Sequence, residues 1–331
     1  MFYFEYSFVR MLDVINIQHF LEIIYKQKFK NYQNLILIYS VKMEKILITG
    51  ATGNYGYAVI ETLIKKGIDK KSIYAMARDE VKAKLLTPFG VKIVFGNYND
   101  YNSMINAFAG IDKLLFVSSG ELGNRSEQHR QVVKAAKNAR VKHILYTSQI
   151  HKTDNPSSPM KFVMKSHLAT EIAIMKSGMN YTILRNGLYL DMLPLFLGKK
   201  VIENGIFLPA GNGKIAFTLR SEMAEVAANI LSSVGHKNKI YDISNKGVSF
   251  LEIASMIHHI TNKNITYVSP DIDTFIKTAI DSGTPKEYAK MLGGFAMAAQ
   301  QGELEGQNSP IEKLLGRKPT SIEGVLEKMY Q

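Results

Sequence analysis

From Met43 onward, short apolar runs alternate with segments whose apolar residues recur at helical spacing. The expected strands are residues 45–49, 72–77, 92–95, 113–118, 143–148 and 181–184, and the expected helices between them include 58–66, 127–139 and 166–177. Strands that are apolar throughout and separated by helices form a parallel sheet with helices on both faces. The sequence therefore predicts an α/β fold built on a doubly wound parallel sheet.

After about residue 185 this alternation becomes less regular. Residues 186–212 are rich in glycine, leucine and proline. The pattern after them predicts a helix at 220–231, a strand at 239–244, a helix at 249–261 and a strand at 265–269. No flexible linker precedes this part. We therefore expect one domain at 43–185 and, packed on it, a smaller C-terminal α/β lobe at 186–331.

Residues 1–42 differ from the rest of the chain. They are aromatic and apolar, but charged residues interrupt every apolar run before the ~18 residues that a membrane-spanning helix needs. They also lack the basic start and the small-residue cleavage site of a signal peptide. A partly amphipathic helix around residues 15–25 is one interpretation. We favour the other, an N-terminal extension upstream of a functional chain that begins at Met43.

A glycine-rich turn follows the first expected strand and precedes a helix. It reads Gly50-Ala51-Thr52-Gly53-Asn54-Tyr55-Gly56. At such a turn the free N–H groups and the dipole of the helix favour a pyrophosphate. Gly50 permits the tight turn, Gly53 lets the backbone approach the phosphates, and Gly56 lets the helix pack close to the sheet. An ordinary turn is the alternative, but the strand and helix around it favour a Rossmann-type dinucleotide site.

The end of the second expected strand bears on which dinucleotide binds. A carboxylate at this place accepts hydrogen bonds from the ribose of NAD, whereas a basic residue pairs with the 2′-phosphate of NADP. Arg78 stands at the tip of that strand, and Asp79 follows one position too late for the ribose carboxylate. A guanidinium suits a bidentate contact with phosphate. The sequence therefore predicts NADPH as the cofactor, with NADH as the alternative.

Composition excludes several other classes of protein. The chain has no cysteine, so it holds no disulfide, no thiolate nucleophile and no cysteine-ligated metal. Its formal net charge of +12 comes from scattered lysines rather than from a dense basic run, and no helix-turn-helix or zinc-ligand spacing is present. We therefore expect a cytoplasmic protein with no metal site, no membrane span and no nucleic-acid partner.

Nine segments, taken in order and spacing, resemble one family. They are 50–56, Arg78, 96–98, 113–118, 135–148, 167–171, 181–189, 235–236 and 315–316. Together they resemble the NmrA-like atypical short-chain dehydrogenases, and within them the type 2 NAD(P)H:quinone oxidoreductases and triphenylmethane-dye reductases. The likeness covers nearly the whole chain from Met43, and residues 1–42 match nothing in the family.

The resemblance implies a role for each matching residue. The pyrophosphate would lie on Thr52, Gly53, Asn54, Tyr55 and Gly56, the 2′-phosphate on Arg78, and the adenine near Asn97 and Tyr98. Ser118, Ser119 and Gly120 would border the cofactor, Tyr146, Thr147 and Ser148 the nicotinamide, and Asn186 to Tyr189 the cofactor and the substrate opening. Ser118 and Ser148 are alternatively strand-end caps.

The catalytic pair of most short-chain dehydrogenases is missing. They place Tyr-x-x-x-Lys on a helix, where the lysine lowers the pKa of the tyrosine so that it moves a proton. Alignment on Glu171 puts Val163 at the tyrosine position and His167 at the lysine position. His167 is a candidate general acid, a partner for a ribose hydroxyl, or a packed side chain. His129, in a polar helix start, and His151, in a loop, are weaker candidates.

Two aromatic residues are candidate walls for a flat acceptor. Tyr189 and Phe207 could stack on an aromatic substrate, or they could be ordinary core residues. Met291 and Met297 are candidates for the mouth of an adaptable pocket, or they are ordinary core residues. The resemblance implies an NADPH-dependent reductase of a quinone or a similar planar acceptor, which forms a possible homodimer. The alternatives are an NAD(P)-binding redox sensor without turnover and a reductase of dyes or enones.

Overall fold

The computed structural model describes residues 26, 43–121, 123–151, 157–306 and 308–331. Met1–Met43 and Glu44–Gln331 form separate units, and the fold described below is that of the second. Apart from Lys26, the expected N-terminal extension lies outside the described residues, so it stays a prediction. In the described ranges, no helix combines the length and the apolar character needed to cross a bilayer.

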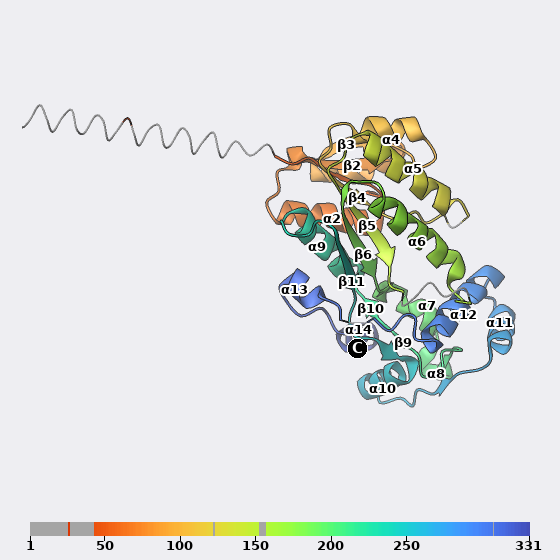
Figure 1. The fold of residues 1–331 in the computed structure, drawn as a ribbon. Helices are drawn as coiled ribbons and strands as arrows, with labels where there is room; N and C mark the ends of the chain where they lie inside the picture. Colours follow the sequence, from red (N-terminus) through yellow and green to blue (C-terminus); the bar gives the residue numbers. More distant parts are fainter. Residues whose placement is uncertain (1–25, 27–42, 122, 152–156, 307) are drawn as a thin grey trace, which may run out of the picture. The chain divides into compact units, whose positions relative to one another are not determined.

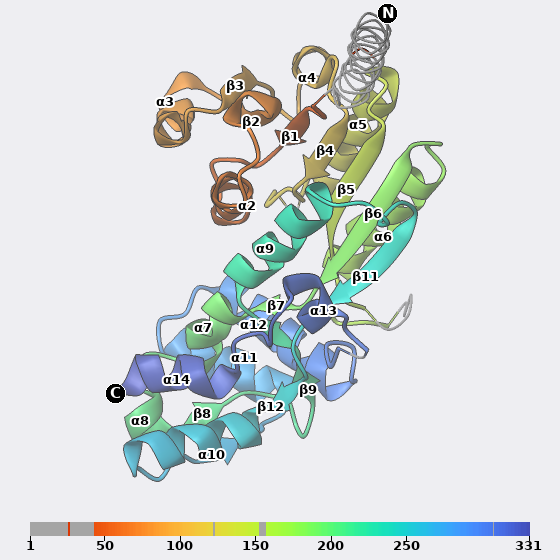
Figure 2. The same ribbon diagram turned by 90° about the vertical axis from the view of Figure 1, so that its left-hand side faces the viewer.

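The framework is a sheet of seven strands in the order β11-β6-β5-β4-β1-β2-β3 (Figure 2). The strands are β1 (Ile46–Ile48), β2 (Ile73–Ala77), β3 (Lys92–Phe95), β4 (Lys113–Phe116), β5 (His143–Gln149), β6 (Asn180–Asn186) and β11 (Lys239–Ile243). All neighbouring pairs are parallel, so the seven carboxyl ends meet at one edge. From β1 the chain proceeds through β2 to β3 on one side of the sheet, and then returns to place β4 on the other side of β1. Such a change of direction leaves a ligand-binding crevice at the carboxyl edge, here between β1 and β4.

Helices cover both faces of the sheet because alternate residues of each strand point to opposite sides. In β1, Ile46 and Ile48 belong to one core and Leu47 to the other. The first core is covered by α2 (Asn54–Lys65), α3 (Glu80–Ala83), α9 (Arg220–Leu231) and α13 (Ile311–Leu315), and the second by α4 (Tyr101–Phe108), α5 (Arg125–Asn138) and α6 (Lys161–Met175). Figure 2 shows α2 and α9 together on one side of the sheet. The predicted Rossmann-type, doubly wound parallel sheet is confirmed.

A smaller lobe lies beyond the carboxyl edge of the sheet (Figures 1 and 2). Its strands form three two-stranded pairs, β7 (Leu188–Tyr189) with β10 (Phe217–Thr218), β9 (Lys214–Ile215) with β12 (Val248–Ser249), and β8 (Ile206–Phe207) with β13 (Tyr267–Val268). Its helices are α7 (Leu193–Leu197), α8 (Val201–Asn204), α10 (Phe250–Thr261), α11 (Ile272–Asp281), α12 (Lys286–Gln300) and α14 (Ile322–Tyr330). Phe196, Phe217, Phe250 and Phe295 pack together at its centre.

Two elements that follow residue 186 belong to the sheet layer rather than to this lobe. Strand β11 pairs with β6 along its whole length, from Lys239 opposite Thr182 to Ile243 opposite Asn186. Helix α9 packs on α2, and its residues Met223 and Ala227 are fully buried there. The chain thus leaves the sheet after β6, returns for α9 and β11, and leaves again. The division into domains at 43–185 and 186–331 stays a prediction.

Candidate functional site

The glycine turn lies between the end of β1 and the first residue of α2. Gly50 has φ +57°, a left-handed conformation that glycine adopts at little cost, and its carbonyl accepts a hydrogen bond from the N–H of Gly53 at 3.0 Å. A Cβ on Gly56 would lie 2.5 Å from that same carbonyl oxygen, so the helix start requires glycine there. No side chain caps the start of α2, which leaves its N–H groups free for a ligand.

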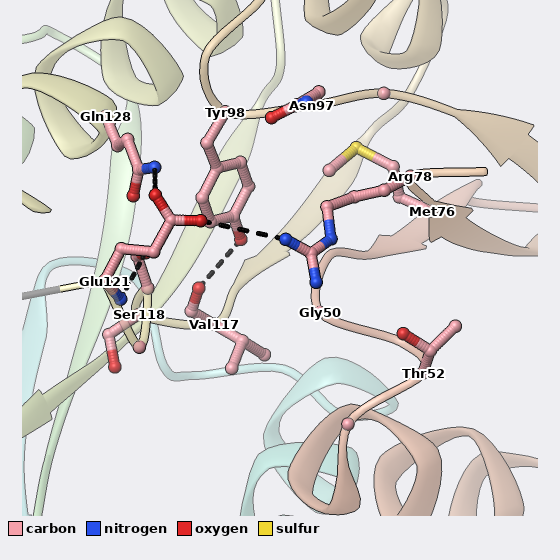
Figure 3. Close-up of a pocket in the computed structure, with 14 residues that line it drawn as sticks. Gly50, Thr52, Met76, Arg78, Asn97, Tyr98, Val117, Ser118, Glu121 and Gln128 are labelled. Atoms are coloured by element: carbon pink, nitrogen blue, oxygen red, sulfur yellow. Dashed lines mark hydrogen bonds and ion pairs between the residues drawn. The ribbon is translucent and has the colours of Figure 1, made fainter. Parts of the chain in front are cut away.

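A cavity of about 340 Å³ opens in front of this turn (Figure 3). Its lining comes from the turn, from the end of β2 and the residues that follow β2, β3 and β4, and from α5. The lining residues are Gly50, Thr52, Gly53, Met76, Arg78, Gly96, Asn97, Tyr98, Val117, Ser118, Ser119, Gly120, Glu121 and Gln128. We call this space the turn cavity. It brings together nine of the residues that the sequence analysis proposed for the cofactor.

Three of the proposed cofactor residues at the glycine turn do not line the turn cavity. Asn54 is exposed at the first position of α2, and Gly56 is buried behind the turn. The Tyr55 side chain points away from the cavity, because its hydroxyl donates to the carbonyl of Met223 in α9 at 3.0 Å. Burial raises the pKa of this phenol. Tyr55 therefore ties α2 to α9 and offers only its backbone to a ligand at the turn.

Arg78 and Glu121 face each other across the turn cavity (Figure 3). Nη1 of Arg78 lies 3.7 Å from Oε1 of Glu121, and both side chains are more than half exposed. The other carboxylate oxygen of Glu121 accepts a hydrogen bond from Nε2 of Gln128 at 2.7 Å. The guanidinium thus stands at the tip of β2 as predicted. The sequence analysis missed its carboxylate partner.

Tyr98 supports the wall of the turn cavity from behind. Its hydroxyl donates to the carbonyl of Val117 at 2.7 Å and lies 2.5 Å from Oγ1 of Thr49. Burial raises the pKa of this phenol, so it stays protonated. The contacts join the end of β1 to the end of β4, the two strands between which the strand order reverses. Only the ring of Tyr98 is left to contact a ligand.

A second cavity, of about 270 Å³, shares Ser118 and Gly120 with the first. We call it the lobe cavity, because the segment that enters the smaller lobe forms one of its walls. Its lining residues are Ser118, Gly120, Arg125, Ser148, Gln149, Val163, His167, Asn186, Gly187, Leu188, Tyr189, Met192, Met291 and Phe295. Val163 and His167 are the two positions of the missing Tyr-Lys pair, and the structure places both at this cavity. Of the two methionines considered, Met291 lines it and Met297 does not.

His167 belongs to a buried cluster of aromatic and imidazole side chains. Its Nδ1 lies 2.7 Å from the hydroxyl of Tyr146, and its Nε2 lies 3.5 Å from Nη1 of Arg125. Burial, followed by the charge of Arg125, lowers the pKa of His167 well below its usual value. The imidazole is therefore neutral at ordinary pH. Tyr146 is completely buried and lines neither cavity.

His129 is buried, although its neighbours in the sequence are polar. It is 1% exposed, packed between the sheet and α6. Its Nε2 accepts from the N–H of Ser119 at 3.0 Å, so Nδ1 carries the proton and donates to Oγ1 of Thr170 at 2.9 Å. Burial, together with Arg125, lowers the pKa of His129 to about 3. This neutral histidine holds the loop that carries the proposed cofactor residues 118–120.

Hydroxyl groups at the end of β5 join neighbouring strand ends. Oγ1 of Thr147 accepts from the N–H of Ser118 at 2.9 Å, and Thr147 itself lines neither cavity. Oγ of Ser148 donates to Glu171 at 2.6 Å. Glu171 in turn accepts from both Nε and Nη2 of Arg185, at 3.1 and 2.6 Å. Ser148 therefore lines the lobe cavity with its hydroxyl already engaged.

Phe207 lines neither cavity, so the structure gives its assignment to the substrate site no support. It lies on β8, which pairs with β13 in the lobe, and its partly exposed ring packs against Phe275. Tyr189, in contrast, lines the lobe cavity. The guanidinium of Arg220 lies 4.5 Å from its ring centroid, so a cation–π contact holds the ring in place.

The comparison with known proteins decides the family. Residues 42–326 match the NmrA-like family. The chain belongs to this family. Quinone oxidoreductase 2 of Escherichia coli (strain K12) is 34% identical over 279 residues, which cover 84% of this chain and 96% of that protein. An NAD(P)H azoreductase of Xenophilus azovorans is 26% identical over 274 residues, with 82% and 93% coverage.

Solved structures of the NmrA-like family share the fold described here. The triphenylmethane reductase of Citrobacter sp., complexed with NADP(H), superposes with a TM-score of 0.78 at 32% identity, covering 87% of this chain and all of that one. The NADPH complex of the quinone oxidoreductase from Escherichia coli gives a TM-score of 0.79 at 32% identity, with 86% and 100% coverage. The resemblance to these two reductases is confirmed.

One residue of this NmrA-like chain that sequence reasoning missed is Arg125. It is the first residue of α5 and lines the lobe cavity, and it is only 8% exposed. The sequence did contain a signal. A cation in the first turn of a helix meets the positive end of the helix dipole, so this position ordinarily favours acidic residues. An arginine there, directly after a loop at the carboxyl edge of the sheet, indicates a special role.

Proposed function

We propose that this chain is an NADPH-dependent reductase that delivers a hydride to a quinone or a similar planar acceptor. The observation that carries the proposal is the pair of adjoining cavities at the carboxyl edge of the sheet. One lies on a glycine turn with an arginine opposite, and the other is lined by aromatic and apolar side chains. The relative named quinone oxidoreductase 2 supports the same reaction. So do the solved structures of the triphenylmethane reductase and the quinone oxidoreductase, which hold NADP(H) and NADPH.

The turn cavity fits a dinucleotide phosphate. The uncapped N–H groups at the start of α2 suit a pyrophosphate, and Gly53 brings the backbone close to it. The exposed guanidinium of Arg78 suits the 2′-phosphate, and Asn97 and Tyr98 offer a wall for the adenine. When bound, the cofactor supplies a hydride, that is, two electrons and one proton. The residues of the turn only bind and orient it.

The lobe cavity suits the acceptor. Tyr189, Phe295 and Met291 supply apolar walls for a flat ring system. Val163 and His167 supply no strong acid, because one is apolar and the other is neutral at ordinary pH. A reduced quinone needs no such acid, since it takes its second proton from water. A cationic triphenylmethane dye becomes neutral on taking up the hydride and needs no proton. An alcohol dehydrogenase, in contrast, needs a tyrosine whose proton it can move.

The test follows NADPH absorbance with the full-length protein and three acceptors, namely benzoquinone, a naphthoquinone and a triphenylmethane dye. We expect acceptor-dependent oxidation that saturates with acceptor. Tight NADPH binding without oxidation by any acceptor would contradict the reductase and favour a redox sensor. Light scattering on the same sample tests the expected homodimer. The absence of cysteine suits a cytoplasmic location, and the lack of a basic run speaks against nucleic acid as a partner.

A further inference from the structure

Arg125 is a buried cation that no acidic group of the described residues neutralises. Among the residues that the structure describes, no carboxylate lies within ion-pair distance of it. Its one hydrogen-bond contact is a long one, 3.5 Å from Nη1 to Nε2 of His167, and its buried Nε has no partner. Burial lowers the pKa of this guanidinium, but an arginine remains charged in proteins. A positive charge therefore lines the lobe cavity without compensation.

The rest of the lobe cavity is electrically neutral. Arg125 is the one formally charged residue among those that line it. Glu171, which accepts from the wall residue Ser148, is already paired with Arg185. A second wall residue, Gln149, also has a buried amide nitrogen without a hydrogen-bond partner in the described chain. Arg125 and Gln149 thus line this cavity with buried donors that the described part of the fold leaves unused.

An arginine in this position is unfavourable for the fold alone. Burial of a charge without a partner is costly, and the N-terminus of α5 adds a second positive potential beside it. A neutral side chain of similar size would avoid both costs. The arrangement becomes favourable only when negative charge appears in the cavity. A donor that the fold holds in place stabilises developing charge without the reorganisation that water needs.

We propose that Arg125 stabilises the negative charge that forms on the oxygen of a carbonyl acceptor, and that it selects carbonyl acceptors such as quinones over cationic dyes. This inference rests on the proposed reductase function. A quinone that takes up a hydride becomes the hydroquinone monoanion: both carbonyl π bonds are lost as the ring becomes aromatic, one oxygen carries the new hydrogen, and the negative charge settles on the other. A proton from water then completes the hydroquinone. A triphenylmethane cation that takes up a hydride becomes neutral, so a cation in the cavity gives that reaction no assistance.

The variants Arg125→Gln and Arg125→Lys test this role in the full-length protein, with Arg130→Gln as the matched control. Arg130 lies on the same helix, but it is exposed and paired with Glu127. For Arg125→Gln we expect kcat/KM with a naphthoquinone to fall about a hundredfold, the usual effect of losing one oxyanion donor. The value with a cationic triphenylmethane dye should stay unchanged or rise. Arg125→Lys should retain most of the quinone activity, and Arg130→Gln should change neither value.

A binding measurement separates this inference from the reductase proposal. A 2-hydroxynaphthoquinone is an anion at neutral pH and resembles the charged product. It is titrated into the NADP⁺-loaded protein. Its affinity should be more than tenfold weaker for Arg125→Gln than for the wild type, and unchanged for Arg130→Gln. This binding measurement tests the role of Arg125 even if the wild-type protein oxidises no NADPH. Equal losses for quinone and dye, accompanied by a higher KM for NADPH, would overturn the inference, because Arg125 would then contact the cofactor. If Arg125→Gln does not fold, Arg125→Met serves in its place.

Discussion

Nη1 of Arg78 lies 3.7 Å from Oε1 of Glu121, and the two side chains meet across the cavity in front of the glycine turn (Figure 3). The 2′-phosphate of NADPH would compete with this carboxylate for the guanidinium. Glu121→Gln should therefore tighten NADPH binding by about threefold, the effect of an exposed ion pair, and leave NADH binding unchanged. Arg78→Ala should weaken NADPH binding alone, by about tenfold or more. NADPH fluorescence on titration measures both effects, and equal changes for the two cofactors would contradict the assignment of Arg78.

Gly53 and Gly56 should respond differently to the same substitution. A Cβ on Gly56 would lie 2.5 Å from the carbonyl oxygen of Gly50, whereas one on Gly53 would lie at an ordinary 3.4 Å. Gly56→Ala should therefore lower the free energy of unfolding by about 1–3 kcal/mol, the cost of overpacking. Gly53→Ala should fold normally and lose affinity for NADPH. Urea unfolding and cofactor titration of the two variants check this, and a stable Gly56→Ala would show that the turn can shift.

Stability should depend on pH through His129. The folded protein holds this imidazole neutral, with its pKa lowered to about 3 by burial and by Arg125. The unfolded chain protonates it below the usual value of 6.5. Its contribution to stability is therefore complete above pH 6.5 and is lost as the pH falls toward about 3, with a slope of at most ~1.4 kcal/mol per pH unit.

The variants His129→Gln and His259→Gln isolate this contribution. His259 is exposed on α10, so its replacement should leave the pH dependence of the wild type intact. His129→Gln should be less stable at neutral pH, because it loses the hydrogen bond to Thr170, but its stability should fall less steeply with acid. Urea unfolding at about pH 7 and about pH 5 measures the slopes. Parallel slopes for wild type and His129→Gln would rule out this histidine as a source of the dependence.

Tyr189 and Phe207 should separate the acceptor site from the core of the lobe. Tyr189→Ala removes an aromatic wall of the lobe cavity, so the KM for a naphthoquinone should rise roughly tenfold while NADPH affinity stays the same. Phe207, which packs on Phe275 and is 37% exposed, lines neither cavity. Phe207→Ala should leave both constants unchanged. Steady-state kinetics with both variants test this prediction. A raised quinone KM in Phe207→Ala would show that the acceptor binds outside the lobe cavity.

The features that the sequence predicted correctly depend on residues close together in the chain. The order strand, glycine turn, helix indicated the turn at Gly50–Gly56, and the end of the next strand indicated Arg78. The absence of the Tyr-Lys pair could likewise be recognised from one helical segment, in which Val163 and His167 are one turn apart. In each case the local backbone geometry determines where the side chain points.

The features that the sequence did not reveal depend on packing between distant segments. His129 looked polar from its neighbours in the sequence, yet it is covered by α6, and its partner Thr170 is 41 residues away. Phe207 lines neither cavity because β8 pairs with β13, some sixty residues further along the chain. Glu121 became notable only when β2 and β4 brought it opposite Arg78.

The sequence by itself determined the alternation of strands and helices, and with it the parallel sheet and the glycine turn at its edge. Periodicity and backbone preferences act within a few residues, so they can be recognised from the chain alone. Only the tertiary structure decided that Arg125 is buried, that it lacks an acidic partner among the described residues, and that it lines the same cavity as Tyr189. Burial and the neutralisation of charge are properties of contacts between segments far apart in sequence, which no local pattern records.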